Sequence, residues 1–404
     1  MAEFVFQDIS FEGKKDRIRV HFLKLFYFDL DKKELSKIAG FAISKNKISF
    51  RGISEARASK KLNFVLSEGF KNLKNKLNGK KTVYIHKNSG IPLIGNGAFG
   101  LIDRGTSLIE IKPITSCNLE CVYCSVDESK RAVDFVIEKD YLISEFKKLV
   151  EFKQMDGIDA HIAAQGEPLL YSPLTELISD LSKIKEVKTI SIDTNGILLN
   201  ERVVDELVKA GLKRFNLSIN ALEPELAQKI ANKAIDIEKI KKICSYIAKK
   251  TGLIITPVLI PGVNEEEIPR LIEFSKDIGA DIGIQNFLNY RFGKNPVNQM
   301  DFGNFYKKLK EWEAKFSVKL IKTAGDFSIE KAKELPKPFK KGEIIKTRII
   351  CPGRLRNEKI AVSRGRVITI PNCHEEGIVK ARITRTKHNI FLAELICQKY
   401  TSGL

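Results

Sequence analysis

The segment SLIEIKPITSCNLECVYC, residues 107–124, places a short β-branched run directly before three cysteines. The run 107–113 has the composition of a strand, and the loop behind it carries Cys117, Cys121 and Cys124. Five similar runs follow, separated by stretches long enough for amphipathic helices. They are DAHIAA (159–164), TISIDT (189–194), RFNLSIN (214–220), GLIITPVLI (252–260) and DIGIQNFL (281–288).

The stretches between these runs have helical periodicity. In DIEKIKKICSYIAKK (236–250), one apolar face carries Ile237, Ile240, Cys244 and Ile247. Cys244 is therefore expected in the core. Six strand–helix units in series predict an α/β fold in which crossover helices cover a parallel sheet. The sheet is either open or curled into a partial (β/α)6 barrel of TIM type, with the active site at the carboxyl ends of its strands.

Polar and glycine residues follow several of these strands. The loops after the second and third strands are Gln165-Gly166-Glu167-Pro168 and Asp193-Thr194-Asn195-Gly196. The fourth strand carries Ser218 and Asn220, and the fifth runs into 261–265. Gly and Asn also simply end strands, so each loop alone leaves both interpretations open. Their coincidence beside a cysteine cluster favours a functional rim.

Three thiolates in one short loop have two main uses. A structural zinc ion takes four protein ligands, so it would require a remote Cys or His as the fourth. A four-iron cluster held by three cysteines leaves one iron open to bind a group that is not protein.

At this point the sequence resembles the radical S-adenosylmethionine (radical SAM) superfamily. Its motif is C, three residues, C, one residue, an aromatic residue and C, which Cys117, Cys121, Tyr123 and Cys124 satisfy. The resemblance covers roughly residues 105–325. It implies a 4Fe-4S cluster on the three cysteines, whose open iron binds SAM. An external low-potential electron donor would then allow cleavage of SAM to a 5′-deoxyadenosyl radical.

The same resemblance implies the residues that contact SAM. Gly166 and Glu167 are similar to the family's GGEP-type turn, which binds the methionine amino group, and Gln165 stands in place of its first glycine. Strand ends similar to those that contact ribose and carboxylate carry Asn195, Ser218 and Asn220. The segment that begins at Val258 is similar to the family's adenine-contacting motif.

The net charge of +19 lies at the two ends of the 404-residue chain. Residues 1–100 hold 20 basic against 9 acidic residues, 101–340 hold 36 of each, and 341–404 hold 13 against 5. We therefore expect a basic N-terminal α/β region (1–100), a radical SAM core (101–330) and a linker with a small β-barrel (331–404). In the stretch 326–343, Pro336 and Pro338 mark the linker.

The composition predicts a soluble cytoplasmic protein without a membrane partner. Hydrophobic residues make up 43% of the chain, and its most apolar segment, LIITPVLIPGV, is too short to span a membrane. The beginning of the chain shows no signal peptide. The stretch 95–100 fits G-x-G-x-x-G, but a strand follows it, so we interpret it as a turn and exclude a dinucleotide fingerprint.

The C-terminal module alternates apolar and polar residues in short runs, which is typical of a small barrel. It resembles the TRAM domain, an RNA-binding barrel of OB type, through Gly353-Arg354, Ala361, the turn near Pro371 and 379–383. Its basic charge favours a phosphate partner over a plain solvated surface. Cys351, Cys373 and Cys397 are interpreted as buried thiols, with an auxiliary cluster or a methyl carrier as alternatives.

Cluster and module together predict an enzyme that modifies a nucleoside in structured RNA, with transfer RNA as the leading partner. The pairing resembles the methylthiotransferases of transfer RNA, but those carry a second three-cysteine cluster, and residues 1–116 contain no cysteine. Methylation and carbon-skeleton reactions are thus as compatible with the sequence as methylthiolation. The alternative is a radical SAM enzyme that acts on a protein or a small metabolite. A non-catalytic RNA-binding protein with a relic cluster is the third.

Overall fold

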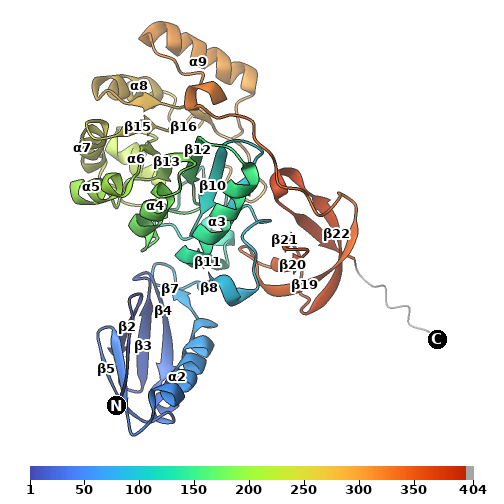
Figure 1. Ribbon diagram of the computed structural model, residues 1–404. Helices are drawn as coiled ribbons and strands as arrows, with labels where there is room; N and C mark the ends of the chain where they lie inside the picture. The colour runs from blue at the N-terminus through green and yellow to red at the C-terminus, as the bar shows by residue number, and fades with distance from the viewer. Residues whose placement is uncertain (397–404) are drawn as a thin grey trace, which may run out of the picture.

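The largest sheet of the protein has seven strands, of which six run parallel (Figure 1). A computed structural model describes residues 1–396. In spatial order the strands are β17 (Asp281–Ile282), β15 (Gly252–Ile255), β14 (Arg214–Leu217), β13 (Val187–Thr194), β12 (Ile158–Ile162), β10 (Leu108–Lys112) and β9 (Gly100–Asp103). Each of the six predicted runs supplies one parallel strand, which confirms the α/β fold. The strand expected directly after the stretch 95–100 forms as β9, which is separate from β10 and pairs with it in antiparallel orientation.

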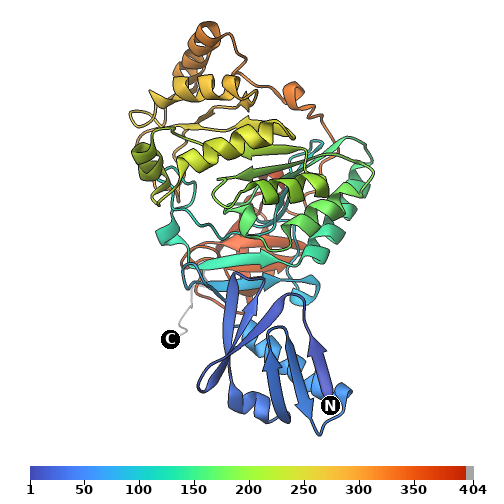
Figure 2. The same cartoon turned by 90° about the vertical axis from the view of Figure 1, so that its left-hand side faces the viewer.

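Helices connect these strands and cover one face of the sheet (Figure 2). They are α3 (Lys139–Lys153), α4 (Leu174–Ser182), α5 (Glu201–Ala210), α6 (Pro224–Ala231), α7 (Ile237–Ala248) and α8 (Glu267–Asp277), with α9 (Phe302–Phe316) after the last strand. Cys244 is fully buried on α7, as predicted. Within residues 1–396 no helix combines the length and hydropathy of a membrane span.

Two of the predicted strands are interrupted. The run 252–260 forms β15 and then β16 (Val258–Leu259), and the run 281–288 forms β17 and then β18 (Gln285–Asn286). Strands β16 and β18 pair in parallel as a separate two-stranded sheet. Pro257 lies at the first break, where its missing N–H cannot support a continuous ladder.

The N-terminal region is mostly β-structure. It contains β1 (Ala2–Val5), β2 (Ile9–Gly13), β3 (Arg17–Phe22), β4 (Phe26–Asp31), α1 (Lys32–Ser36), β5 (Gly40–Ser44), β6 (Lys47–Arg51), α2 (Glu55–Phe70), β7 (Lys74–Asn75) and β8 (Lys81–Ile85). One sheet has the order β1-β6-β5, and another has the order β11-β8-β7-β4-β3-β2. Strand β11 (Val133–Ile137) follows the cysteine loop, so this loop is anchored in the N-terminal sheet.

The C-terminal module is a closed five-stranded barrel in the order β19-β20-β21-β23-β22, which confirms the predicted small β-barrel. Its strands are β19 (Ile344–Pro352), β20 (Lys359–Ser363), β21 (Arg366–Ile370), β22 (Ile378–Arg385) and β23 (Leu392–Leu395). Cys373 is buried in the barrel core, and Cys351 packs against the main core, which fits buried thiols. Cys397 lies outside the described residues.

The barrel packs directly on the rest of the protein. Ile360 and Val367 belong to the main hydrophobic core. The Val367 N–H donates to the Ile94 carbonyl at 2.9 Å, and the Phe391 N–H donates to the Gly95 carbonyl at 2.9 Å. Gly95 has φ +131°, and a Cβ there would lie 2.1 Å from the Val367 oxygen. The stretch 95–100 is thus a turn, as predicted, and its first glycine permits the close contact with the barrel.

A buried ion pair joins helix α3, strand β9 and the chain that leads to the barrel. Lys153 Nζ lies 2.7 Å from Asp103 Oδ1, and neither side chain is exposed to solvent. Asp103 also accepts hydrogen bonds from the N–H groups of Gly105 at 2.9 Å and Leu335 at 2.8 Å. Removal of one partner would leave a buried charge uncompensated.

We predict that Lys153→Met lowers the free energy of unfolding by about 3–5 kcal/mol, because Asp103 would lose its counter-charge. Chemical denaturation measures this change. The control is Lys148→Met on the same helix, where the lysine side chain is 69% exposed. Its effect should stay within about 0.5 kcal/mol. Equal effects of the two substitutions would contradict the structural role of the buried pair.

Candidate active site

A cavity of about 330 Å³ lies where the carboxyl ends of the parallel strands meet the cysteine loop. Nine of the ten site residues predicted from the sequence line it: Cys117, Cys121, Tyr123, Cys124, Gly166, Glu167, Asn195, Ser218 and Val258. The tenth, Asn220, lines a smaller adjoining cavity together with Tyr123 and Ser218. The structure therefore brings the predicted residues together, while their individual roles stay predictions.

The cysteine loop places its three half-buried thiols at the cavity. The Leu119 N–H donates to Cys117 Sγ at 3.4 Å. Burial raises the pKa of Cys117 to about 12 and that of Cys121 to about 11. These thiols are thus protonated at neutral pH before iron binds, and iron binding must release protons because thiolates are the ligands.

The donor set fits a cluster held by three cysteines. In a four-iron cluster each cysteine binds its own iron atom, so three sulfurs need not converge on one point. In the part of the chain that the structure describes, no three His, Cys, Asp or Glu side chains are grouped to hold a single metal ion. Three thiols on one loop, beside a cavity with polar walls, meet the needs of a cluster with one open iron.

Gly166 and Glu167 join the loop after β12 to the root of the cysteine loop. A Cβ at position 166 would lie 2.3 Å from the Ser116 oxygen, so only glycine fits there. The Glu167 N–H donates to the same oxygen at 2.8 Å. The sequence identifies this glycine by its motif, and the contact with Ser116 supplies the physical reason.

The Glu167 carboxylate is almost completely buried and organises the rim. It accepts hydrogen bonds from the Leu169 N–H at 3.0 Å, the Thr194 hydroxyl at 2.7 Å and the Asn195 N–H at 2.8 Å. Burial outweighs these bonds and raises its pKa to about 7. A carboxylate has about four acceptor positions, so one further donor can still be accommodated.

Two asparagines connect the remaining rim segments. Asn195 Nδ2 donates to Asn118 Oδ1 at 2.8 Å, which ties the loop after β13 to the cysteine loop. Asn220 Nδ2 donates to the Tyr123 hydroxyl at 3.0 Å, and Asn220 Oδ1 accepts from the Val258 N–H at 2.8 Å. Burial raises the pKa of Tyr123 well above its ordinary value.

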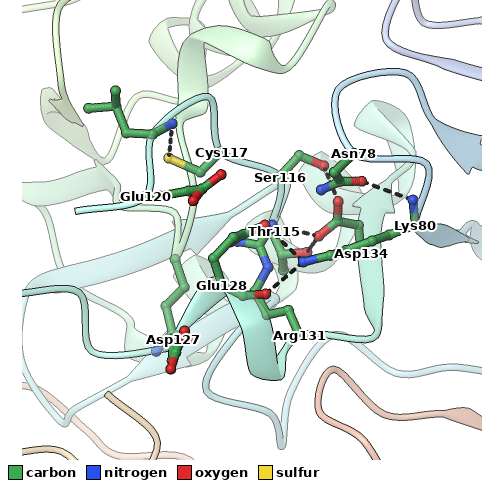
Figure 3. Close-up of polar contacts among 12 residues, drawn as sticks. Asn78, Lys80, Thr115, Ser116, Cys117, Glu120, Asp127, Glu128, Arg131 and Asp134 are labelled. Carbon is green, nitrogen blue, oxygen red and sulfur yellow. Dashed lines mark hydrogen bonds and ion pairs between the residues drawn. The ribbon is translucent and has the colours of Figure 1, made fainter. Parts of the chain in front are cut away.

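A buried network supports the cysteine loop from the side of the N-terminal sheet (Figure 3). Asp134 Oδ2 accepts from the Ser116 hydroxyl at 3.0 Å and from Asn75 Nδ2 at 2.7 Å. Arg131, which lines the cavity, donates to Asp134 Oδ1 at 3.0 Å and pairs with Glu128 at 2.9 Å. Sequence reasoning missed this network because Asn75 and Ser116 lie 59 and 18 residues from Asp134 along the chain.

The barrel also reaches the cavity wall. Arg354, in the loop between β19 and β20, donates to the side-chain oxygen and to the backbone carbonyl of Gln165. Arg354 is 4% exposed, and burial lowers its pKa to about 10. Its own carbonyl accepts from the Ala132 N–H at 2.8 Å. Gly353-Arg354, which carried part of the TRAM resemblance, thus contacts the central domain.

The face of the sheet opposite the helices is polar. The side chains that alternate with the buried apolar residues are Glu110 and Lys112 on β10, Asp159 and His161 on β12, Ser191 and Asp193 on β13, and Arg214 and Asn216 on β14. Strands of parallel sheets are usually apolar on both faces, so this alternation is a signal that the sequence alone could have given.

Asp193 is the member of this polar face that lines the cavity. It lies 3.2 Å from His161 Nε2, and its other oxygen accepts from Asn216 Nδ2 at 2.9 Å. Burial opposes ionisation of both groups. His161 nevertheless holds the pKa of Asp193 below its usual value, and Asp193 raises that of His161. A substrate with N–H or O–H donors could therefore bind at this position.

We predict that Cys117→Ala/Cys121→Ala/Cys124→Ala protein binds no cluster after anaerobic reconstitution, because no thiolate remains in the cavity. Iron content and visible absorbance measure the loss. Cys351→Ala is the matched control and should retain the iron of the wild type, since Cys351 packs away from the cavity in the main core. Wild-type iron content in the triple variant would contradict the assignment of these ligands.

Comparisons with known proteins agree with this geometry. The family model of the radical SAM superfamily matches residues 111–275. An uncharacterized protein of Methanocaldococcus jannaschii is 40% identical over 372 residues, which cover 83% of this chain and 85% of that protein. A GTP 3′,8-cyclase of Aquifex aeolicus is 30% identical over 204 residues, which cover 50% of this chain and 61% of the cyclase.

Among solved structures, Streptococcus suis SuiB bound to its precursor peptide SuiA aligns with a TM-score of 0.45 and 16% identity. The alignment covers 79% of this chain and 71% of SuiB. A likeness at this level carries no argument about substrate. The match over residues 111–275 covers both the cysteine loop and the rim loops of the cavity. Residues 111–275 of the chain therefore form a radical SAM domain.

Proposed function

We propose that the protein binds a 4Fe-4S cluster and SAM in the 330 Å³ cavity and cleaves SAM reductively to a 5′-deoxyadenosyl radical. The observation that carries this proposal is the convergence of three cysteines with the loops after β12 and β13 on one cavity. When bound, the cluster supplies an open iron for the amino and carboxylate groups of SAM and passes on the electron from an external donor.

The residues of the chain would hold SAM and exclude water. The loop 165–167, fixed against Ser116, would accept hydrogen bonds from the methionine ammonium group. Asn195 and Ser218 border the cavity where ribose and carboxylate are expected, and Val258 borders it where adenine is expected. The polar sheet face around Asp193 would then bind the substrate. Such positioning is the main contribution of a protein to cofactor chemistry.

For the substrate, we propose a nucleoside in structured RNA, with transfer RNA as the leading candidate. The support is a basic strand face on the barrel, made of the exposed side chains of Lys346 and Arg348 on β19 and Lys380 and Arg382 on β22. Lys346 pairs across the ladder with Lys380. Like charges directly opposite each other destabilise the strand pair, and a phosphate bound between them would offset their repulsion.

The strand order of the barrel supports RNA binding, but the packing of its loops restricts where RNA could bind. Five strands with β21 parallel to β23 and the other neighbours antiparallel resemble an OB-type barrel. In OB folds the second and third strands and two loops bind oligonucleotides. Here one of those loops carries Arg354, which contacts Gln165, and Phe391 of the other contacts Gly95. RNA would therefore have to use the basic strand face.

Because these two barrel loops contact the rest of the chain, we also consider a second candidate function, in which the substrate is a small metabolite or a segment of protein. In this case the barrel would serve to complete the cavity wall. The GTP 3′,8-cyclase relatives, named for a nucleotide substrate, match about half of this chain. Mass spectrometry of RNA nucleosides from a strain that lacks the gene distinguishes the two candidates. A missing modified nucleoside supports RNA, and an unchanged nucleoside profile supports the second candidate.

We predict that replacement of Lys346, Arg348, Lys380 and Arg382 by Gln flattens the salt dependence of transfer RNA binding. Each neutralised phosphate contributes a logarithmic slope of about −0.7 to −0.9, so the loss of four such contacts should change the slope by about three units. Filter binding at several salt concentrations measures it. The matched control replaces Lys307, Lys308, Lys310 and Lys315 on α9. An equal change in both variants would contradict the basic strand face as the RNA contact.

A further inference from the structure

Arg354 is a cation in an unusual position. Its side chain is 4% exposed, yet both of its hydrogen-bond acceptors are neutral oxygens of Gln165. Its Nε has no hydrogen-bond partner among residues 1–396. Arg131, a second buried cation, has carboxylate partners in Glu128 and Asp134. The charges of Asp134 and Glu128 only partly offset the lowering of the Arg354 pKa by burial. Burial of a guanidinium without a directly paired carboxylate is costly, so stability alone does not account for this position.

The contact of Arg354 leads directly to the proposed SAM site. Gln165 precedes Gly166, which packs against Ser116, and Ser116 precedes Cys117. The backbone carbonyl of Arg354 also accepts from the N–H groups of Ala132 and Val133, which follow the cysteine loop. One loop of the barrel thus holds both the chain that follows the cysteines and the rim loop that lines the cavity.

We propose that Arg354, a residue of the C-terminal barrel, is a positioning residue for SAM that acts through Gln165. Its planar fork fixes the Gln165 backbone and side chain together, which sets the orientation of the loop 165–167 that would meet the methionine ammonium group. The barrel is then a part of the cofactor site. This inference rests on the proposed SAM cleavage and explains why the chain has Gln at position 165, where the family motif has glycine.

The residues suggest a matched set of full-length variants. Arg354→Lys keeps the charge but loses the two-pronged donor. Gln165→Gly removes the side-chain acceptor from the other side of the contact. Arg356→Lys is the control, because the Arg356 side chain is exposed on the same loop and makes no hydrogen bond within residues 1–396. The Arg356 backbone N–H donates to the Lys130 carbonyl at 3.4 Å.

The first test is the kinetics of SAM cleavage by reconstituted protein with dithionite. Arg354→Lys and Gln165→Gly should each raise the KM for SAM about tenfold. Iron content and kcat should stay near the wild-type values, since the cysteines are untouched. The KM for SAM of the double variant should be no higher than that of the more impaired single variant, because both substitutions remove the same contact. Wild-type KM values, or effects of the two substitutions that add, would overturn the proposal.

The second test does not depend on activity. Hydrogen–deuterium exchange of the peptide 163–170 in the protein before iron loading should be at least about tenfold faster in Arg354→Lys than in the wild type and in Arg356→Lys. Unchanged exchange would overturn the positioning role. If the wild type did not cleave SAM at all, the proposed function would fail, and the exchange rates would still report whether Arg354 holds the loop.

Discussion

The close approach of Gly166 to the backbone of Ser116 is the constraint on which the candidate active site depends. Because a Cβ at position 166 would lie 2.3 Å from the Ser116 oxygen, the loop after β12 lies directly against the root of the cysteine loop. The Glu167 N–H bonds to the same oxygen, and its buried carboxylate carries the connection on to Thr194 and Asn195. The cysteine loop and the rim loops are therefore held as one unit. Catalysis requires fixed distances between cofactor and substrate, and such a unit would maintain them.

This unit is supported from two sides by parts of the chain that are distant in sequence. On one side, Asn75 of the N-terminal sheet reaches Asp134 and Ser116 within a buried network. On the other side, Arg354 of the barrel reaches Gln165. Buried polar contacts of this kind add little net stability but specify one arrangement of the groups that they join. The basic N-terminal and C-terminal regions thus support the loops that line the cavity, in addition to any contact with an anionic partner.

Local patterns in the sequence predicted the features that depend on local physics. Strand runs, the helix with Cys244 and the cysteine spacing follow from period, composition and motif. Contacts between distant segments could not be predicted from local sequence patterns. Examples are the contact of Gly95 with Val367 and that of Arg354 with Gln165, because the residues next to each partner along the chain do not indicate them. The polar sheet face is an intermediate case. Its alternation is present in IEIK and SIDT, but the strand composition of these runs alone predicts a parallel sheet without showing that one face is polar.

The central claim is that the three cysteines hold a cluster whose open iron binds SAM. Electron paramagnetic resonance of the anaerobically reconstituted, reduced protein tests it most directly, because a ligand on one iron changes the electronic structure of the whole cluster. The reduced protein should give the signal of a 4Fe-4S cluster, and this signal should change in shape and position when SAM is added. A four-iron signal that is identical with and without saturating SAM would contradict it.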